Sequence, residues 1–226
     1  MSFAVIEGLD GSGKSTQIRL LQEYLSQKKV KYKFLHFPRT DAPFFGELIA
    51  RFLRGELGNI DTVNPYLVAL IYAGDRKDAA ATISSWLLDD FLVIADRYVN
   101  SNIAFQCAKI KEEHEIDKLA NWILKLEYEY YKIPKPDRNI FLDVPFAFTR
   151  SNLTIGRTGN DREYLKGNTD IHEENLDFQQ NVREIYLQQA QKDDLFQLID
   201  CSDNDGNILP PEKIFEKLIS MISPLI

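Results

Sequence analysis

The chain has 226 residues, of which 44% are hydrophobic, so it can bury one sizeable core in a single domain with a small lid. Its formal net charge of −7 argues against a protein that wraps nucleic acid, although a local cluster of arginines can still bind a small anionic substrate. No apolar run approaches the ~20 residues of a membrane-spanning helix, so we expect no membrane partner. The two cysteines lack metal-ligand spacing and favour a reducing compartment, so we expect a cytoplasmic protein.

Short apolar runs alternate with segments of helical spacing along the chain. The predicted strands are Phe3–Glu7, Tyr32–Phe37, Phe91–Ala95, Ile140–Val144 and Leu195–Ile199. The predicted helices are Ser15–Lys28, Phe44–Leu53, Tyr66–Leu88, Ser101–Tyr131 (with an interruption left open), Leu176–Gln191 and Pro211–Ile222. This alternation predicts an α/β fold of three layers, with a roughly five-stranded parallel sheet flanked by helices.

The polar segment 151–172 has three glycines and little periodic pattern. It is longer than an ordinary connection in a compact domain, so we predict a mobile lid on the single domain 1–226. The alternative interpretation is a disordered surface loop.

The first predicted strand is followed by a phosphate-binding loop, or P-loop. The sequence GLDGSGKS, from Gly8 to Ser15, fits G-x-x-x-x-G-K-[ST] without a mismatch and precedes a predicted helix. Its glycines let backbone N–H groups turn toward phosphate oxygens, and the helix adds its positive N-terminal end. Lys14 supplies charge at the β and γ phosphates, and Ser15 offers a hydroxyl to Mg²⁺. The motif by itself predicts a bound nucleoside triphosphate with Mg²⁺ and does not indicate the reaction. The residues expected to bind this donor, which we expect to be ATP, are Gly8, Asp10, Gly11, Ser12, Gly13, Lys14, Ser15 and Thr16.

Two further strands end beside an arginine. Phe37-Pro38-Arg39 follows the second strand, and Asp96-Arg97 follows the third. Ligands of open parallel sheets bind at the carboxyl ends of strands, and guanidinium groups bind phosphate bidentately. These residues predict a P-loop kinase with an anionic acceptor, whereas the alternative is a pair of surface ion pairs, such as Asp96 with Arg97.

Other P-loop proteins remain as alternatives at this point. The N-K-x-D motif by which GTPases bind their base is absent from the sequence. A kinase for a deoxynucleoside or for UMP and CMP is the nearest alternative. A non-catalytic nucleotide switch is the alternative from another class, and the arginines at two strand ends argue against it.

Five segments, taken in order, resemble the thymidylate kinase family. They are FAVIEGLDGSGKSTQ, HFPRTD, NPYLVALIYAGDR, DRYVNSNIAF and PDRNIFLDVP, and the resemblance extends from residue 3 to about residue 200. It implies transfer of the γ-phosphate of ATP to dTMP, which gives dTDP and ADP. It also implies a homodimer, formed through the helices before and after the third strand.

The resemblance implies which residues bind the base and sugar of dTMP. Tyr72 would stack on thymine, and Arg76, one turn later on the same helix face, would donate to thymine O4. Asn102 would meet the base edge, and Phe105 would crowd C2′ and so disfavour ribose. For Tyr72 and Phe105, the alternative interpretation is packing in the core.

The resemblance implies a second group of residues at the acceptor phosphate. Phe37 and Arg39 would pack on and grip the nucleotide, and Arg97 would hold its phosphate. Asp10 would lie near the 3′-hydroxyl, and Asp96 near the metal. The acceptor phosphate is already anionic at pH 7, so no general base is expected.

The lid carries the remaining catalytic candidates. One branch of the family has an arginine in the P-loop where this chain has Gly11. The resemblance then implies that lid arginines supply positive charge, with Arg157 and Arg162 as candidates and Arg150 at the edge. The sequence DIHE at 170–173 resembles the acidic segment that closes the lid. The implied catalytic residues are Lys14, Asp96, Arg97, Arg157 and Arg162.

Overall fold

A computed structural model of the chain describes residues 2–155, 160–173 and 175–226. Five parallel strands form one sheet in the order β2-β3-β1-β4-β5. The strands are β1 (Ser2–Glu7), β2 (Tyr32–His36), β3 (Leu92–Asp96), β4 (Arg138–Asp143) and β5 (Phe196–Asp200). Strand β1 lies in the middle, paired with β3 on one side and β4 on the other. The predicted α/β fold with a five-stranded parallel sheet is confirmed.

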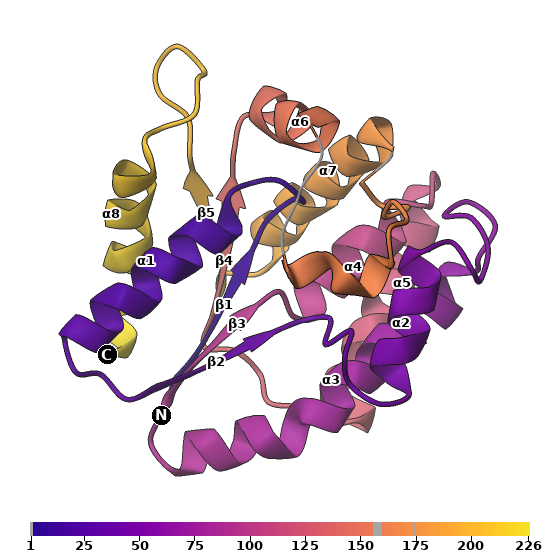
Figure 1. Cartoon of the computed structure of the whole chain (residues 1–226). Helices are drawn as coiled ribbons and strands as arrows, with labels where there is room; N and C mark the ends of the chain where they lie inside the picture. The colour runs from indigo at the N-terminus through magenta and orange to yellow at the C-terminus, as the bar shows by residue number, and fades with distance from the viewer. Residues whose placement is uncertain (1, 156–159, 174) are drawn as a thin grey trace.

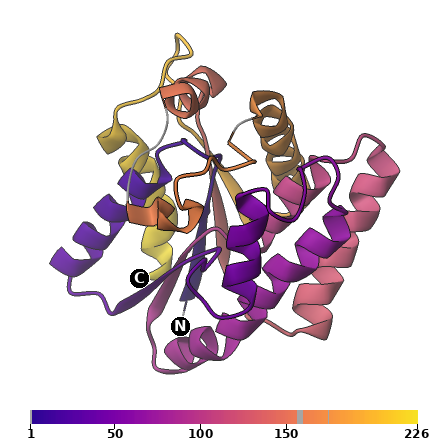
Figure 2. The ribbon, with the colours of Figure 1, turned by 45° about the vertical axis from the view of Figure 1, so that its right-hand side comes forward.

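Helices cover both faces of this sheet (Figures 1 and 2). They are α1 (Lys14–Gln27), α2 (Phe45–Leu53), α3 (Pro65–Leu88), α4 (Val99–Cys107), α5 (Glu113–Leu124), α6 (Phe146–Ile155), α7 (Leu176–Lys192) and α8 (Pro211–Ile222). Helices α1 and α8 pack on one face, and α3, α4, α5 and α7 pack on the other. Within the described residues, no helix is long and apolar enough to cross a membrane.

The side chains of β1 alternate between the two faces of the sheet. Phe3 and Val5 belong to the core cluster shared with α3, α4, α5 and α7, whereas Ile6 belongs to the cluster shared with α1 and α8. Strand β3 alternates in the same way. Because both faces are covered, these central strands are apolar throughout and not only at every second position.

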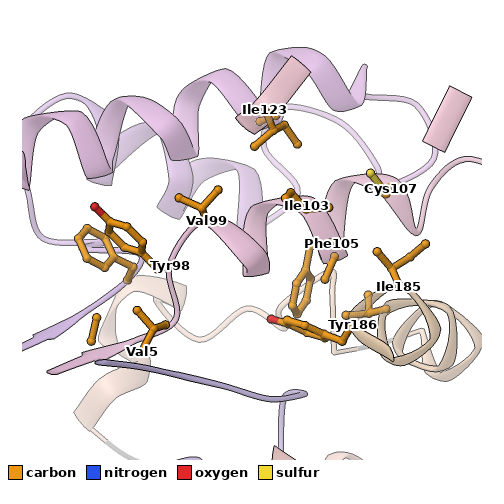
Figure 3. Close-up of a cluster of buried hydrophobic side chains, with 14 of the residues drawn as sticks. Val5, Tyr98, Val99, Ile103, Phe105, Cys107, Ile123, Ile185 and Tyr186 are labelled. Carbon is orange, nitrogen blue, oxygen red and sulfur yellow. The ribbon is translucent and has the colours of Figure 1, made fainter. Parts of the chain in front are cut away.

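Helix α4 is buried along its whole length. Figure 3 shows Ile103 and Cys107 on this helix, with Ile123 of α5 on one side and Ile185 and Tyr186 of α7 on the other. A helix enclosed in this way has no solvent-exposed face, which explains its lack of amphipathic pattern. It also fixes the position of the chain immediately after β3, where the predicted Asp96 and Arg97 lie.

The structure differs from the sequence prediction in two stretches. The segment predicted as Ser101–Tyr131 is divided into α4, α5 and a π-helical turn, η1 (Lys125–Tyr130), with a break at residues 108–112. The segment 151–172 contains more regular structure than its polar sequence indicated. Helix α6 extends to Ile155, and a 3₁₀ helix, η2, covers Asn160–Leu165. Movement of this segment as a lid stays a prediction.

Candidate active site

The loop between β1 and α1 has the backbone that a P-loop needs. Gly13 has a φ of 82° and is the N-cap of α1, a conformation that favours glycine. A Cβ atom at Gly8 would lie only 2.8 Å from Oγ of Ser12, so a larger residue there would force the Ser12 side chain to shift. Helix α1 begins at Lys14, directly after the loop, so the positive end of its dipole lies where phosphates are expected.

The predicted ATP-binding residues lie together around this loop. A pocket of about 300 Å³ is lined by Gly11, Ser12, Gly13, Lys14, Ser15 and Thr16, together with Asn152 and Ile155 of α6. Asn152 donates a 2.7 Å hydrogen bond to the carbonyl oxygen of Gly11, so α6 covers the loop from one side. Nζ of Lys14 donates to the carbonyl oxygens of Leu9 and Gly8, at 3.0 and 3.3 Å.

A second, larger cavity of about 1170 Å³ lies at the carboxyl ends of β2 and β3 and beside the P-loop. Its lining includes the whole set of predicted acceptor residues, which are Asp10, Phe37, Arg39, Tyr72, Arg76, Arg97, Asn102 and Phe105. Lys14, Ser15 and Asp96 line the same cavity. One continuous cavity therefore joins the predicted donor site to the predicted acceptor site.

Arg97 is held in this cavity by four neighbours. It has a φ of 66°, in the left-handed region where non-glycine residues are strained and are often functional. Its Nη2 donates to Oδ1 of Asp10 at 2.8 Å, and its Nη1 donates to Oγ of Ser101 at 3.1 Å and to the hydroxyl of Tyr186 at 3.3 Å. Its guanidinium carbon lies 5.0 Å from the ring centre of Phe105. Figure 3 shows that Phe105 and Tyr186 point toward each other from α4 and α7.

Arg97 stays charged in spite of its burial. Burial lowers the pKa of Arg97, but the surrounding acidic groups, of which Asp10 contributes most, together outweigh this effect and hold that pKa above its ordinary value. A second carboxylate, on the fully buried Glu7, accepts hydrogen bonds from the backbone N–H groups of Tyr98 and Ser101. Burial raises the pKa of Glu7 despite these bonds. The chain therefore places a permanent cation in a site that excludes most water.

Asp96 is a buried carboxylate with one unpaired oxygen. Its Oδ2 lies 3.0 Å from Nδ1 of His36, whereas its Oδ1 is buried and has no hydrogen-bond partner among the described residues. Burial raises the pKa of Asp96, but the hydrogen bond with His36 and the charge of Lys14 together bring it below its ordinary value. An ionised oxygen without a partner, in the same cavity as the hydroxyl of Ser15, is a suitable ligand for a hard cation.

Two of the predicted base-binding residues, Arg76 and Asn102, bind the same carboxylate, that of Glu127. Nε and Nη2 of Arg76 donate to Oε2 and Oε1 of Glu127, at 2.5 and 2.7 Å. Nδ2 of Asn102 donates to Oε1 of the same carboxylate at 3.0 Å. Tyr72 lies one turn before Arg76 on α3, and burial raises the pKa of its hydroxyl well above the ordinary value.

Arg39 forms ion pairs with carboxylates, which is what the alternative to phosphate binding predicted for this residue. Its Nε donates to Oδ1 of Asp75 at 2.8 Å, and its Nη2 donates to Oδ2 of Asp78 at 2.7 Å. Arg39 nevertheless lines the large cavity. The two aspartates hold it against α3, so any phosphate that it binds has to share the guanidinium with them.

Residues from the predicted lid close the cavity on another side. The hydroxyl of Tyr164 donates to Oδ2 of Asp170 at 2.8 Å, and burial together with the charge of Asp10 raises the pKa of Asp170 to about 7. The ring of His172 lies 5.0 Å from that of Phe105, and burial lowers the pKa of His172 to about 3. Gln179 of α7 donates to Oδ2 of Asp10 and to the carbonyl oxygen of His172, at 3.0 and 2.9 Å.

Comparison with known proteins decides the family. Residues 6–208 match the family model described as thymidylate kinase. The chain belongs to the thymidylate kinase family. It is 31% identical to thymidylate kinase of Mycobacterium tuberculosis over 82% of this chain and 84% of that protein. It is 34% identical to probable thymidylate kinase 1 of Saccharolobus solfataricus over 94% and 95% of the two chains.

The fold agrees with a solved member of the thymidylate kinase family. The structure of thymidylate kinase from Candida albicans matches with a TM-score of 0.71 at 24% identity, over 99% of this chain and 91% of that one. This likeness supports the fold alone. The roles of individual residues depend on the geometry described above.

The two lid arginines cannot be placed in this thymidylate kinase site. Arg157 lies outside the described residues, and Arg162 lies in η2 with its side chain outside what the structure describes. Arg150, at the edge of the lid, is exposed on α6 and lines a different, shallower pocket. The roles of all three stay predictions.

Several residues that contact the predicted site residues were not expected from the sequence. They are Glu7, His36, Ser101, Glu127, Gln179 and Tyr186. Glu7 had a local signal, because it is a charged residue at the end of an apolar strand beside a P-loop. Glu127, Gln179 and Tyr186 had none, because each reaches the site from a helix that is distant along the chain.

Proposed function

We propose that this chain is a dTMP kinase, which transfers the γ-phosphate of ATP to dTMP and gives dTDP and ADP. The observation that carries this proposal is the single cavity lined both by Lys14 and Ser15 of the P-loop and by Arg39 and Arg97 at the strand ends. Such a cavity can hold a donor triphosphate and an anionic acceptor together, as in-line phosphoryl transfer requires. Membership of the thymidylate kinase family supports dTMP as the acceptor.

The P-loop binds the donor. Its backbone N–H groups and the N-terminus of α1 surround the phosphates, because Gly13 adopts a positive φ and no side chain blocks the position of Gly8. Nζ of Lys14 moves from the loop carbonyls to the β and γ phosphates. It then stabilises the charge that develops between them.

Arg97 and Arg39 bind the acceptor phosphate. Arg97 is fixed by Ser101 and Tyr186, so it holds the phosphate in one orientation and loses little side-chain freedom on binding. The acceptor oxygen is already anionic at neutral pH, so the reaction needs no general base. Asp10, which shares Arg97 with that phosphate, lies near the 3′-hydroxyl of the acceptor.

The residues beside the P-loop fit Mg²⁺. Oδ1 of Asp96 is buried without a partner among the described residues, and Ser15 lines the same cavity. Mg²⁺ usually takes one or two protein oxygens and completes its shell with phosphate oxygens and water. The described residues contain no group of three or more His, Cys, Asp or Glu that could hold a metal, which agrees with a site of this kind. When bound, Mg²⁺ supplies positive charge to the phosphate oxygens during transfer.

The rings of Phe105 and His172 form the sugar end of the site. They lie 5.0 Å apart, and both residues line the cavity. A ribose 2′-hydroxyl would have to enter this crowded contact between the two rings, which disfavours ribonucleotides. Tyr72 stacks on thymine from α3.

Closure of residues 151–172 excludes water, and the lid arginines Arg157 and Arg162 add positive charge.

The direct test measures ADP release from ATP·Mg²⁺ with dTMP, dUMP, UMP, CMP, AMP or thymidine as the acceptor. The proposal predicts a strong preference for dTMP and little ADP without an acceptor. A preference for thymidine, or ADP release that does not depend on an acceptor, would contradict it. The Lys14→Ala variant is the control for contaminating kinases, because it removes the charge at the donor phosphates.

A homodimer in the cytoplasm completes the proposal. Helix α3 exposes Leu67 and Leu70, which are 60% and 38% exposed, and an apolar helix face of this kind supports association. Cys107 and Cys201 are both free thiols, which agrees with a reducing compartment. Sedimentation equilibrium of the chain and of a Leu67→Glu variant tests the dimer, and a monomer at micromolar concentration for both proteins would contradict it.

A further inference from the structure

We propose that Glu127 is a positioning residue that fixes Arg76 and Asn102, so that the site binds a base with an N3–H donor and an O4 acceptor. This inference rests on the proposed acceptor site and extends it to a residue that touches neither phosphate nor base.

The first part of the argument is the geometry of Arg76. Arg76 and Glu127 are 1% and 0% exposed, and they form a two-point pair through Nε and Nη2. A bidentate pair fixes the plane of the guanidinium group as well as its position. Arg76 lines the cavity, and Nη1 is the part of its guanidinium that Glu127 does not engage. Arg76 therefore presents a donor, never an acceptor, to a base in the cavity.

The second part is the orientation of the Asn102 amide. Its Nδ2 has two hydrogens and two acceptors, the carbonyl oxygen of Ala69 and Oε1 of Glu127, both at 3.0 Å. A reversed amide would place Oδ1 against those two oxygens, neither of which can donate. The amide is therefore held with Oδ1 on its free side. That oxygen is buried and has no hydrogen-bond partner among the described residues.

The two groups together have a defined polarity. A buried acceptor without a partner is unfavourable until a donor reaches it, and Asn102 lines the cavity. Thymine and uracil offer a donor at N3 and an acceptor at O4, which match Oδ1 of Asn102 and the guanidinium of Arg76. Cytosine offers an acceptor at N3 and a donor at N4, so both contacts would be repulsive. Glu127 helps to set this polarity, because its carboxylate fixes the Arg76 guanidinium and, together with the Ala69 carbonyl oxygen, the Asn102 amide.

The position of Glu127 follows from the irregular end of α5. The chain there forms the π-helical turn η1, in which the N–H of Tyr131 donates to the carbonyl oxygen of Leu126 at 2.8 Å. Glu127 is the buried residue of this turn, whereas Glu129 is exposed. Turns of this kind are rare and occur often at functional sites. A fully buried carboxylate needs a compensating charge, and Arg76 supplies it.

The test compares Glu127→Gln with Glu129→Gln, a matched control of the same charge change on the same turn. The acceptors are dTMP and 5-methyl-dCMP, which have the same shape and differ only in the polarity of the base edge. In Glu127→Gln, Arg76 loses its carboxylate partner, and the glutamine amide can donate to a reversed Asn102, which only the Ala69 carbonyl oxygen then opposes. We therefore expect Glu127→Gln to raise KM for dTMP about tenfold and to lower its preference over 5-methyl-dCMP by at least about tenfold. KM for ATP should stay within about twofold of the wild type, because the P-loop is untouched. Glu129→Gln should behave as the wild type.

A purely structural role gives a different result. An unchanged preference of Glu127→Gln for dTMP over 5-methyl-dCMP would overturn the proposal. A parallel rise of KM for dTMP and KM for ATP, together with a lower Tm, would also overturn it. If Glu127→Gln does not fold, Glu127→Asp serves instead, because a carboxylate one methylene shorter cannot reach both partners. A wild-type preference in Glu127→Asp would then overturn the proposal.

Binding separates this inference from the proposed function. Calorimetric titration of the wild-type chain with dTMP and with 5-methyl-dCMP measures the preference without turnover. Tight binding of dTMP alone, without phosphoryl transfer, would support the inference and contradict only the kinase assignment. Equal binding of the two nucleotides by an active enzyme would contradict only the inference.

Discussion

Nη2 of Arg97 lies 2.8 Å from Oδ1 of Asp10, and this ion pair joins the end of β3 to the P-loop. Asp10 also accepts a 3.0 Å hydrogen bond from Gln179, so α7 is connected to the same point. The Arg97 and Asp10 side chains are only 9% and 18% exposed. An acceptor phosphate therefore meets a cation that is already oriented and partly neutralised, and it has to share that cation with Asp10.

Replacement of Arg97 by alanine should abolish most of the catalysis without loss of ATP binding. The variant lacks the group that holds the acceptor phosphate, so we expect kcat/KM for dTMP to fall by about 10³-fold or more. ATP affinity, measured by calorimetry, should change little. Arg51→Ala is the control, because Arg51 forms a surface pair with Glu56 away from the cavity. Turnover equal to that of the wild type would refute the role given to Arg97.

Replacement of Asp96 by asparagine should raise the Mg²⁺ requirement. The change removes the ionised oxygen for which the described part of the chain supplies no hydrogen-bond partner, whereas the amide keeps the size of the side chain. We expect the Mg²⁺ concentration for half-maximal rate to increase about tenfold, since one charged metal ligand is lost. The measurement is a Mg²⁺ titration of the rate at fixed ATP. An unchanged titration midpoint would remove Asp96 from the metal site.

Replacement of Phe105 by alanine should weaken the exclusion of ribose. The smaller side chain leaves space beside His172, so the preference for dTMP over ribothymidine monophosphate should fall about tenfold or more. Phe178→Ala is the matched control, because Phe178 packs on the other two rings of this cluster, within 6.0 Å of Phe105. Both variants should lose roughly 3 kcal/mol of stability. If the two variants showed the same sugar preference, Phe105 would be a packing residue only.

The buried Asp170 should make the stability of the chain depend on pH. Its pKa is raised to about 7 in the folded state, against an ordinary value near 4, so the folded chain binds more protons than the unfolded chain between these values. The free energy of unfolding should therefore fall as pH rises from about 4 to about 7. The neighbouring charges are those of Asp10 and Glu173.

The Asp170→Asn variant lacks this dependence. The free energy of unfolding of this variant, minus that of the wild type, should increase as pH rises from about 4 to about 7. The increase should be at most about 1.4 kcal/mol per pH unit. Urea unfolding at several pH values measures this difference, with Asp205→Asn in an exposed loop as the control. A difference that stays constant from pH 4 to pH 7 would show that Asp170 is not protonated in the folded chain.

The P-loop and the arginines were predictable because their signals are local. Lys14 and Ser15 belong to a contiguous motif, Arg97 directly follows an apolar strand, and Arg39 lies three residues after the end of another strand. The parallel sheet then brings the strand ends to one edge, so position along the chain was enough to place them together.

Other parts of the structure have no local signal. Glu127 lies 51 residues from Arg76 along the chain, and Tyr186 lies 179 residues from Glu7, so only the tertiary fold makes them neighbours. Helix α6 was missed for a different reason. Phe146 and Phe148 pack against different core clusters, so the helix has no single apolar stripe.

The central claim is tested most directly by following the label of [γ-³²P]ATP in the presence of Mg²⁺ and dTMP. We predict that the label appears in dTDP, in a one-to-one ratio with ADP, and that the Arg97→Ala variant forms almost none. Label that appears instead in inorganic phosphate, with dTMP unchanged, would contradict the assignment of this chain as a dTMP kinase.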